Sequence, residues 1–261
     1  MRVRDEFRAC LSGQFSDLAK SGALASPAPP VTSRYPARVV LTLARDPRPL
    51  VRRVVAECAR TVKGSVRVLL RLTSDENAEV RSAAIESVAS LLEGGRCPPE
   101  LLARMGDRDT LVRTVTAGAL GQIGDARALP SLWAALADAS PLVRSYVAAA
   151  IGQLGTPKDT ARLVARAKLE RSPAARIGFC DGVYRLGDRP FALGRLLRLL
   201  ANRDHRVRCA AANTLASLQI GRNESLRVRK VLRLGLKQER TPAGREAMLR
   251  CIRALKTANT R

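Results

Sequence analysis

Ionisable side chains recur through this sequence as a pair, an acidic or amide residue followed six positions later by an arginine. The pairs are Asp46/Arg52, Asp75/Arg81, Asp107/Arg113, Asp138/Arg144, Glu170/Arg176, Asn202/Arg208 and Glu239/Arg245. A carboxylate and a guanidinium at this spacing can form charge-assisted hydrogen bonds, and carboxylates can also serve general acid–base catalysis. The arginines follow one another at intervals of 29, 32, 31, 32, 32 and 37 residues. A pair that recurs in every repeat is expected to build the scaffold, because a catalytic site would not recur.

The elements that carry these pairs are predicted to be helices. The residues four, seven and ten positions after each arginine are almost always apolar, and these spacings place them on one stripe of a helix. Gly124, Gly155 and Gly187 are expected to end helices through a left-handed residue. Second helices are expected at 128–137, 159–169, 190–201 and 226–237. We therefore predict an all-α fold, a right-handed α-solenoid of about seven helix pairs.

Two regions are expected along the chain. Residues 1–45 read as a divergent N-terminal capping segment that contains a Pro/Ser-rich loop at 21–37. Residues 46–261 read as the repeat array, which can occupy the whole remaining length because a solenoid grows in one dimension.

The acidic residue and the arginine are expected to have separate structural roles. The acidic residue can accept hydrogen bonds from the first turn of the helix that follows. The arginine can reach the acidic residue of its own or of an adjacent repeat. This predicts a structural ladder along the array, made of Asp46, Arg52, Asp75, Arg81, Asp107, Arg113, Asp138, Arg144, Arg176 and Arg208.

Few other residues suggest chemistry. The six cysteines include no CxxC pair and there is one histidine, so the spacing of zinc ligands is lacking. The carboxylates are spread one or two per repeat, and no glycine-rich phosphate loop is present. We therefore expect no catalytic residue, no metal site, no cofactor and no enzyme activity. Free cysteines favour a cytoplasmic location, and uncharged runs of 13 residues such as 145–157 are too short for a membrane span.

The net charge of +23 is placed unevenly. Residues 161–261 carry 24 basic and 7 acidic residues, and so +17 of the total. This asymmetry favours an acidic partner such as nucleic acid, an anionic membrane or an acidic protein. A second explanation stays open, because arginine outnumbers lysine 39 to 7, as GC-rich coding also produces.

The repeat motif resembles a known family. DRDTLVRTVTAGALGQIGDARALPSLWAALA and DASPLVRSYVAAAIGQLG are similar to the HEAT-like repeat of the phycobilin lyase subunits and of many bacterial scaffold proteins. The resemblance covers about residues 46–256, and Ala175 and Gly244 depart from it by replacing the valine before the arginine. It implies that the Val-Arg helix lines the concave face of the solenoid and that the other helix lies outside.

That orientation assigns a concave groove to the positions one, five and eight after each arginine. The candidates for partner binding are Arg53, Glu57, Thr114, Gly118, Gly121, Ser145, Ala149, Gly152, Asp181, Tyr184 and Asn213. The middle of this groove is small and nearly uncharged, which suits a helix or an extended peptide. Alternatively, the glycines and alanines only allow neighbouring helices to pack closely.

The same orientation places a basic patch on the convex side, on the second helices. It comprises Arg162, Arg166, Arg195, Arg198, Arg229, Lys230, Arg233 and Lys237. Nucleic acid binding through phosphates needs such a patch, whereas a run of charge is also typical of a solvated face.

These observations predict a non-enzymatic scaffold or adaptor that holds a protein or peptide in its groove. A nucleic-acid-binding protein that uses residues 161–261 is the alternative. An accessory subunit of a chromophore lyase is a third hypothesis, which the resemblance alone suggests. The sequence predicts neither the partner's identity nor the oligomeric state.

Overall fold

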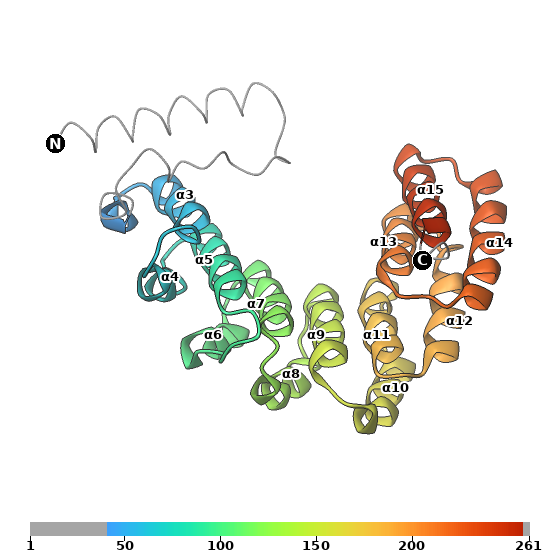
Figure 1. Cartoon of the computed structure of the whole chain (residues 1–261), viewed down its shortest axis with the longest axis horizontal. Helices are drawn as coiled ribbons and strands as arrows, with labels where there is room; N and C mark the ends of the chain where they lie inside the picture. Colours follow the sequence, from blue (N-terminus) through green and yellow to red (C-terminus); the bar gives the residue numbers. More distant parts are fainter. Residues whose placement is uncertain (1–40, 258–261) are drawn as a thin grey trace. The chain divides into compact units, whose positions relative to one another are not determined.

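A computed structural model describes residues 41–257, drawn in colour in Figure 1. Most of the predicted N-terminal cap, with its whole Pro/Ser-rich loop, lies outside the described residues. The chain divides into two compact units, Met1–Asp125 and Ala126–Arg261.

The first unit holds helices of two kinds. The longer ones carry the arginine pairs and pack in series, α3 on α5 and α5 on α7; they are α3 (Pro49–Ala59), α5 (Ala78–Leu91) and α7 (Thr110–Ile123). The shorter ones are α4 (Val66–Leu72) and α6 (Pro99–Ala103), with 3-10 turns η2 (Leu43–Arg45) and η3 (Arg104–Gly106). Each short helix packs on the long helix that follows it.

The second unit repeats this arrangement. The arginine-bearing helices pack in series and form what we call the first-helix row: α9 (Pro141–Leu154), α11 (Pro173–Arg185), α13 (His205–Ser217) and α15 (Pro242–Thr257). The others form the second-helix row: α8 (Leu129–Ala135), α10 (Thr160–Leu169), α12 (Arg189–Leu199) and α14 (Arg222–Gln238). Turns η4 (Ala126–Ala128) and η5 (Pro157–Asp159) precede α8 and α10. Each second helix packs on the first helix of the next repeat, so the two rows form two layers (Figure 1).

The core forms where the sequence pattern predicts it. The positions four and seven after the arginine are buried in repeats one to six, for example Ile85, Val88 and Leu120. Repeat seven departs from the pattern, since Leu249 is exposed and the preceding Met248 is buried in its place. Small aliphatic side chains thus fill the space between helices, as expected for a chain with 3% aromatic residues.

The described residues are all-α, without a strand, and this prediction is confirmed. They contain six helix pairs and then a single helix, α15, so the seventh repeat shows one helix within the described part of the chain. Two of the three predicted glycines are left-handed, with φ of +84° at Gly124 and +114° at Gly187. Gly155 is extended, at φ −76° and ψ 178°, because a loop leads from it directly into the capped turn η5.

Candidate functional site

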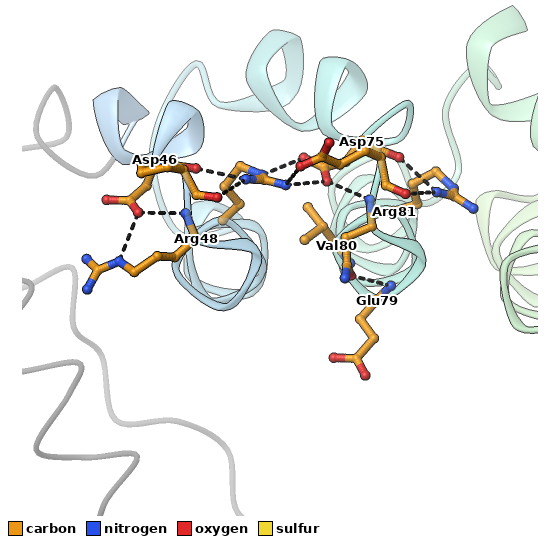
Figure 2. A network of polar contacts seen from close by, with 10 residues as sticks. Asp46, Arg48, Asp75, Glu79, Val80 and Arg81 are labelled. Atoms are coloured by element: carbon orange, nitrogen blue, oxygen red, sulfur yellow. Dashed lines mark hydrogen bonds and ion pairs between the residues drawn. The ribbon is translucent and has the colours of Figure 1, made fainter.

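The recurring arginine ties its own repeat to the next one. Nε and Nη2 of Arg52 donate to the two carboxylate oxygens of Asp75 in the next repeat, at 2.8 and 2.9 Å. Nη1 of Arg52 donates to the main-chain oxygen of Asp46 in its own repeat, at 2.8 Å. Figure 2 shows the same main-chain contact one repeat later, between Arg81 and Asp75. We call an arginine together with the acidic residue of the next repeat a rung.

Further rungs have this geometry in both units. Arg81 donates to Asp107 at 2.8 Å in the first unit. In the second unit, Arg144 donates to both oxygens of Glu170 at 2.7 and 3.0 Å, and Arg208 to both oxygens of Glu239 at 2.6 and 2.8 Å. A two-pronged contact of this kind is directional, so it sets the register between consecutive repeats.

The acidic residue does not cap the helix in the predicted way. The carboxylate of Asp75 accepts the main-chain N–H of Asn77, two residues on, at 2.9 Å. Asn77 is the residue that caps α5, because its side chain accepts the N–H groups of Glu79 and Val80. The acidic residue is thus two positions too early to reach the first turn, and its carboxylate closes the turn before the helix.

The two glutamate rungs keep their charges at neutral pH. The hydrogen bond from Arg208 outweighs burial and, with Thr241, lowers the pKa of Glu239 to about 2. The hydrogen bond from Arg144 likewise lowers the pKa of Glu170. Paired carboxylates with depressed pKa values are poor general acids or bases at neutral pH, so these residues offer cross-links between repeats.

The structural ladder has no rung at Arg176. Nε of Arg176 donates to the main-chain oxygen of Glu170 at 2.8 Å, whereas its counterparts make this contact with Nη1. The next repeat offers Asn202 where the other rungs have an acid, and Arg176 has no acidic partner among the described residues. The amide oxygen of Asn202 still closes its turn by accepting the N–H of Asp204 at 2.9 Å.

The two repeats that lack valine before the arginine are those whose acidic residue is glutamate. Ala175 follows Glu170 and Gly244 follows Glu239, whereas the repeats with Asp or Asn carry valine at that position. A Cβ atom added to Gly244 would overlap the carboxyl carbon of Glu239. The longer acidic side chain therefore folds over the start of the helix and leaves room for a small residue only.

Several predicted groove residues are buried. Thr114, Gly121, Gly152, Asp181 and Tyr184 have little or no exposed surface, so they do not offer a surface to a partner. The half-buried candidates are Arg53, Glu57, Gly118, Ser145 and Ala149, and Asn213 is exposed. All three candidates at position eight after the arginine are thus buried, as are one candidate at position one, Thr114, and one at position five, Asp181.

Close packing of α9 on α11 explains this burial in the second unit. A Cβ atom on Gly152 would overlap the main chain of Gly182, and one on Gly178 would overlap the main-chain oxygen of Ser145. Gly152 therefore serves close packing between neighbouring helices, which was the alternative explanation for the small residues of the predicted groove. Tyr184 turns inward and donates its hydroxyl to the main-chain oxygen of Gln219 at 2.7 Å.

The exposed edge of α9 carries apolar side chains that the sequence analysis missed. Leu142 is 49% exposed and Tyr146 46%. With half-buried Ala149 and exposed Gln153 they lie at spacings of four, three and four along one face of the helix, which we call the α9 ridge. The sequence contained a signal for this position. Leucine recurs two residues before the arginine in three repeats, at Leu50, Leu111 and Leu142.

On α3 of the first unit, the predicted groove residues Arg53 and Glu57 are charged and paired. Nε of Arg53 donates to Glu57 at 3.0 Å and Nη1 to Glu79 at 2.9 Å. Positive and negative side chains therefore balance one another between α3 and α5.

The predicted basic residues lie on the second-helix row of the second unit. Arg162 and Arg166 on α10, Arg198 on α12 and Lys230, Arg233 and Lys237 on α14 are exposed, while Arg195 and Arg229 are half-buried. None of these eight forms an ion pair within residues 41–257. We refer to them as the basic patch.

The repeat geometry agrees with comparisons to known proteins. Residues 66–95 match a family model described as HEAT repeat, and residues 98–179 match one described as HEAT repeats. This is a HEAT-repeat protein. None of the curated proteins matches its sequence.

Solved structures share the fold of this HEAT-repeat protein. The complex of CpcE and CpcF of phycocyanin lyase from Nostoc sp. PCC7120 has a chain with 16% identity and a TM-score of 0.63, over 88% of this chain and 97% of that one. YibA of E. coli has 15% identity and a TM-score of 0.50, over 85% and 93% of the two chains. At these identities the likeness shows the fold alone.

No cluster of three His, Cys, Asp or Glu residues that could hold a metal ion occurs between residues 41 and 257. Burial raises the pKa of Cys58 to about 11 and those of Cys180 and Cys251 to about 12, which keeps these thiols protonated. No described helix is long and apolar enough to cross a membrane.

Proposed function

We propose that this HEAT-repeat protein is a non-enzymatic scaffold whose α9 ridge captures an amphipathic helix or an extended segment of a protein partner. The observation that carries the proposal is the exposure of Leu142 and Tyr146, four residues apart on α9. Elsewhere in the first-helix row of the second unit, Leu249 on α15 is the large apolar side chain that is exposed.

The chemistry of the ridge suits a protein segment. Leucine and tyrosine one helical turn apart match the spacing with which an amphipathic helix presents its own apolar residues. Tyrosine is enriched among the residues that dominate binding energy, because it buries a large ring and keeps a polar hydroxyl. The small Ala149 lies next along the ridge, and it allows the main chain of a partner to approach closely.

The support beneath the ridge favours binding. The main chains of α9 and α11 touch at Gly152 and Gly178, and the rung between Arg144 and Glu170 joins the same two repeats. A surface held by these contacts loses little conformational entropy when a partner binds, so more of the contact energy appears as affinity.

A site-specific cross-linking experiment tests the proposal. A photo-reactive amino acid replaces the exposed Gln153 on the ridge, with replacement of the exposed Gln238 on α14 as the matched control. Both proteins are irradiated in nuclease-treated cell lysate, and the adducts are identified by mass spectrometry. We expect a protein adduct that forms from position 153, not from position 238.

The double variant Leu142→Arg/Tyr146→Arg identifies the surface responsible. It should abolish the adduct, whereas Leu226→Arg/Leu234→Arg, at two exposed leucines of α14, should leave it intact. Thermal unfolding checks that both variants fold. An adduct that survives the ridge variant would show that the partner docks elsewhere.

A further inference from the structure

We infer that the second-helix row of the second unit is a second binding surface, and that it takes the phosphate backbone of double-stranded nucleic acid. This surface belongs to helices other than the α9 ridge. It comprises the basic patch together with Lys168, Arg189, Arg222 and Arg227 on the same helices.

The charge of this surface is left uncompensated. The described residues contain one acidic side chain within α10, α12 and α14, that of Glu224. The exposed Arg162, Arg198 and Lys230 have no carboxylate within ion-pair distance inside residues 41–257. Clustered positive charge without internal partners attracts a polyanion, since phosphate neutralisation releases the counterions of the nucleic acid.

Neutral groups hold several of these arginines in place. The guanidinium of Arg162 lies over the ring of Trp133 at 4.0 Å from its centroid, and that of Arg195 over Phe191 at 4.5 Å. Nη2 of Arg166 donates to the main-chain oxygen of Leu136 at 3.5 Å. These contacts orient the guanidinium groups without cancelling their charge, which is the arrangement that prepares an arginine for a phosphate.

The type and spacing of the cations fit phosphates. Most of the surface is arginine, whose planar fork binds phosphate oxygens in pairs. On α14, Arg222, Arg229 or Lys230, Arg233 and Lys237 return about every one or two turns. At about 5.4 Å per turn, this interval is comparable to the separation of phosphates along a strand.

The same contacts favour a duplex over a single strand. Proteins that bind single strands stack bases on open aromatic rings. Here Trp133 and Phe191 are half-buried and carry an arginine over one face. A duplex needs no such platform, because its phosphates are offered on the outside.

A membrane fits the surface less well. A helix that lies in a membrane interface needs a continuous apolar face. On α14 the apolar residues Val228 and Leu232 are buried in the repeat core, and the exposed Leu226 and Leu234 are separated by Lys230. Anionic vesicles therefore serve as a competing ligand in the test.

Salt-dependent binding of the full chain tests the inference. Fluorescence anisotropy measures the Kd for a short random-sequence duplex, as DNA and as RNA, over a series of salt concentrations. The patch variant is Arg162→Gln/Arg166→Gln/Arg198→Gln/Lys230→Gln. The control variant removes the same charge from exposed residues of the first unit: Lys63→Gln/Arg67→Gln/Arg71→Gln/Arg108→Gln.

We expect both duplexes to bind, with an affinity that falls steeply as salt rises. The patch variant should reduce the slope of log Kd against log salt by about 4, because each lost phosphate contact removes about one unit of slope. The control variant should bind as the wild type does. Circular dichroism verifies that both variants are folded.

Three results would overturn the inference. These are an absence of duplex binding at low salt, equal losses in the two variants, and stronger binding to phosphatidylserine vesicles or polyglutamate than to either duplex. None of them bears on the α9 ridge, whose test uses nuclease-treated lysate and different variants.

Discussion

Two sets of arginines in the second unit differ in what surrounds them. Arg144 and Arg208 lie in the first-helix row, where each gives two hydrogen bonds to a buried carboxylate of the next repeat. Arg162 and Arg195 lie in the second-helix row, where they rest on aromatic rings and have no acidic partner among the described residues. The residue type is the same, and its place in the repeat decides whether its charge holds the protein together or is available to a ligand.

The two units show the same difference on a larger scale. Residues 1–125 carry 19 basic and 14 acidic residues, while residues 126–261 carry 27 and 9. The rungs use similar numbers of charges in each, so the excess of the second unit lies outside them. GC-rich coding also produces an arginine-rich composition, whereas the lack of carboxylates on α10 and α12 is a property of this surface.

The largest expected effect comes from breaking a rung. Glu239→Ala should lower the free energy of unfolding by about 3 kcal/mol, because Arg208 would be left mostly buried without a counter-charge. Arg233→Ala, in the second-helix row, should change it by less than about 0.5 kcal/mol. Urea unfolding of the full chain measures both, and similar losses would remove the distinction between the two sets of arginines.

A smaller effect should follow from a larger side chain at Gly244, beside the carboxyl group of Glu239. Gly244→Val should cost about 2 kcal/mol, because a Cβ atom there overlaps the carboxyl group of Glu239. In the Gly244→Val/Glu239→Asp variant the shorter acid restores the combination found in repeats one to four, and much of that loss should be recovered. Thermal unfolding of the two single variants and the double variant gives the coupling, and strictly additive losses would contradict the explanation.

The smallest effect concerns Arg176, which has no acidic partner in the next repeat. Asn202→Asp should raise the free energy of unfolding by about 1 kcal/mol, since Arg176 would gain a carboxylate where the neighbouring rungs have one. Asn213→Asp on the exposed side of α13 adds the same charge without that partner and should have no measurable effect. Equal stabilisation by both would indicate a general effect of net charge.

Much of this architecture could be predicted from local sequence. The arginine interval indicated the repeats, and spacings of three and four placed Ile85, Val88 and Leu120 in the core, because helical periodicity is a property of neighbouring residues. The resemblance to HEAT-like repeats agreed with the family matches. Each of these features depends on residues within one repeat.

The candidate surfaces were harder to predict. The burial of Gly152 depends on how closely α9 approaches α11, and that distance is set by residues of two repeats together. The stacking of Arg162 on Trp133 likewise joins two helices of different repeats.

The sequence by itself determined the helices, their core faces and the recurring acid–arginine pair, since these follow from spacing along the chain. Only the tertiary structure decided that Arg52 binds the carboxylate of Asp75 in the next repeat and the main-chain oxygen of Asp46 in its own. Both acids are within reach of a long side chain in the sequence pattern, and the packing of α3 on α5 selects between them. In the second unit, the packing of consecutive repeats likewise gives Arg144 and Arg208 a counter-charge, while Arg162 and Arg195 have none among the described residues.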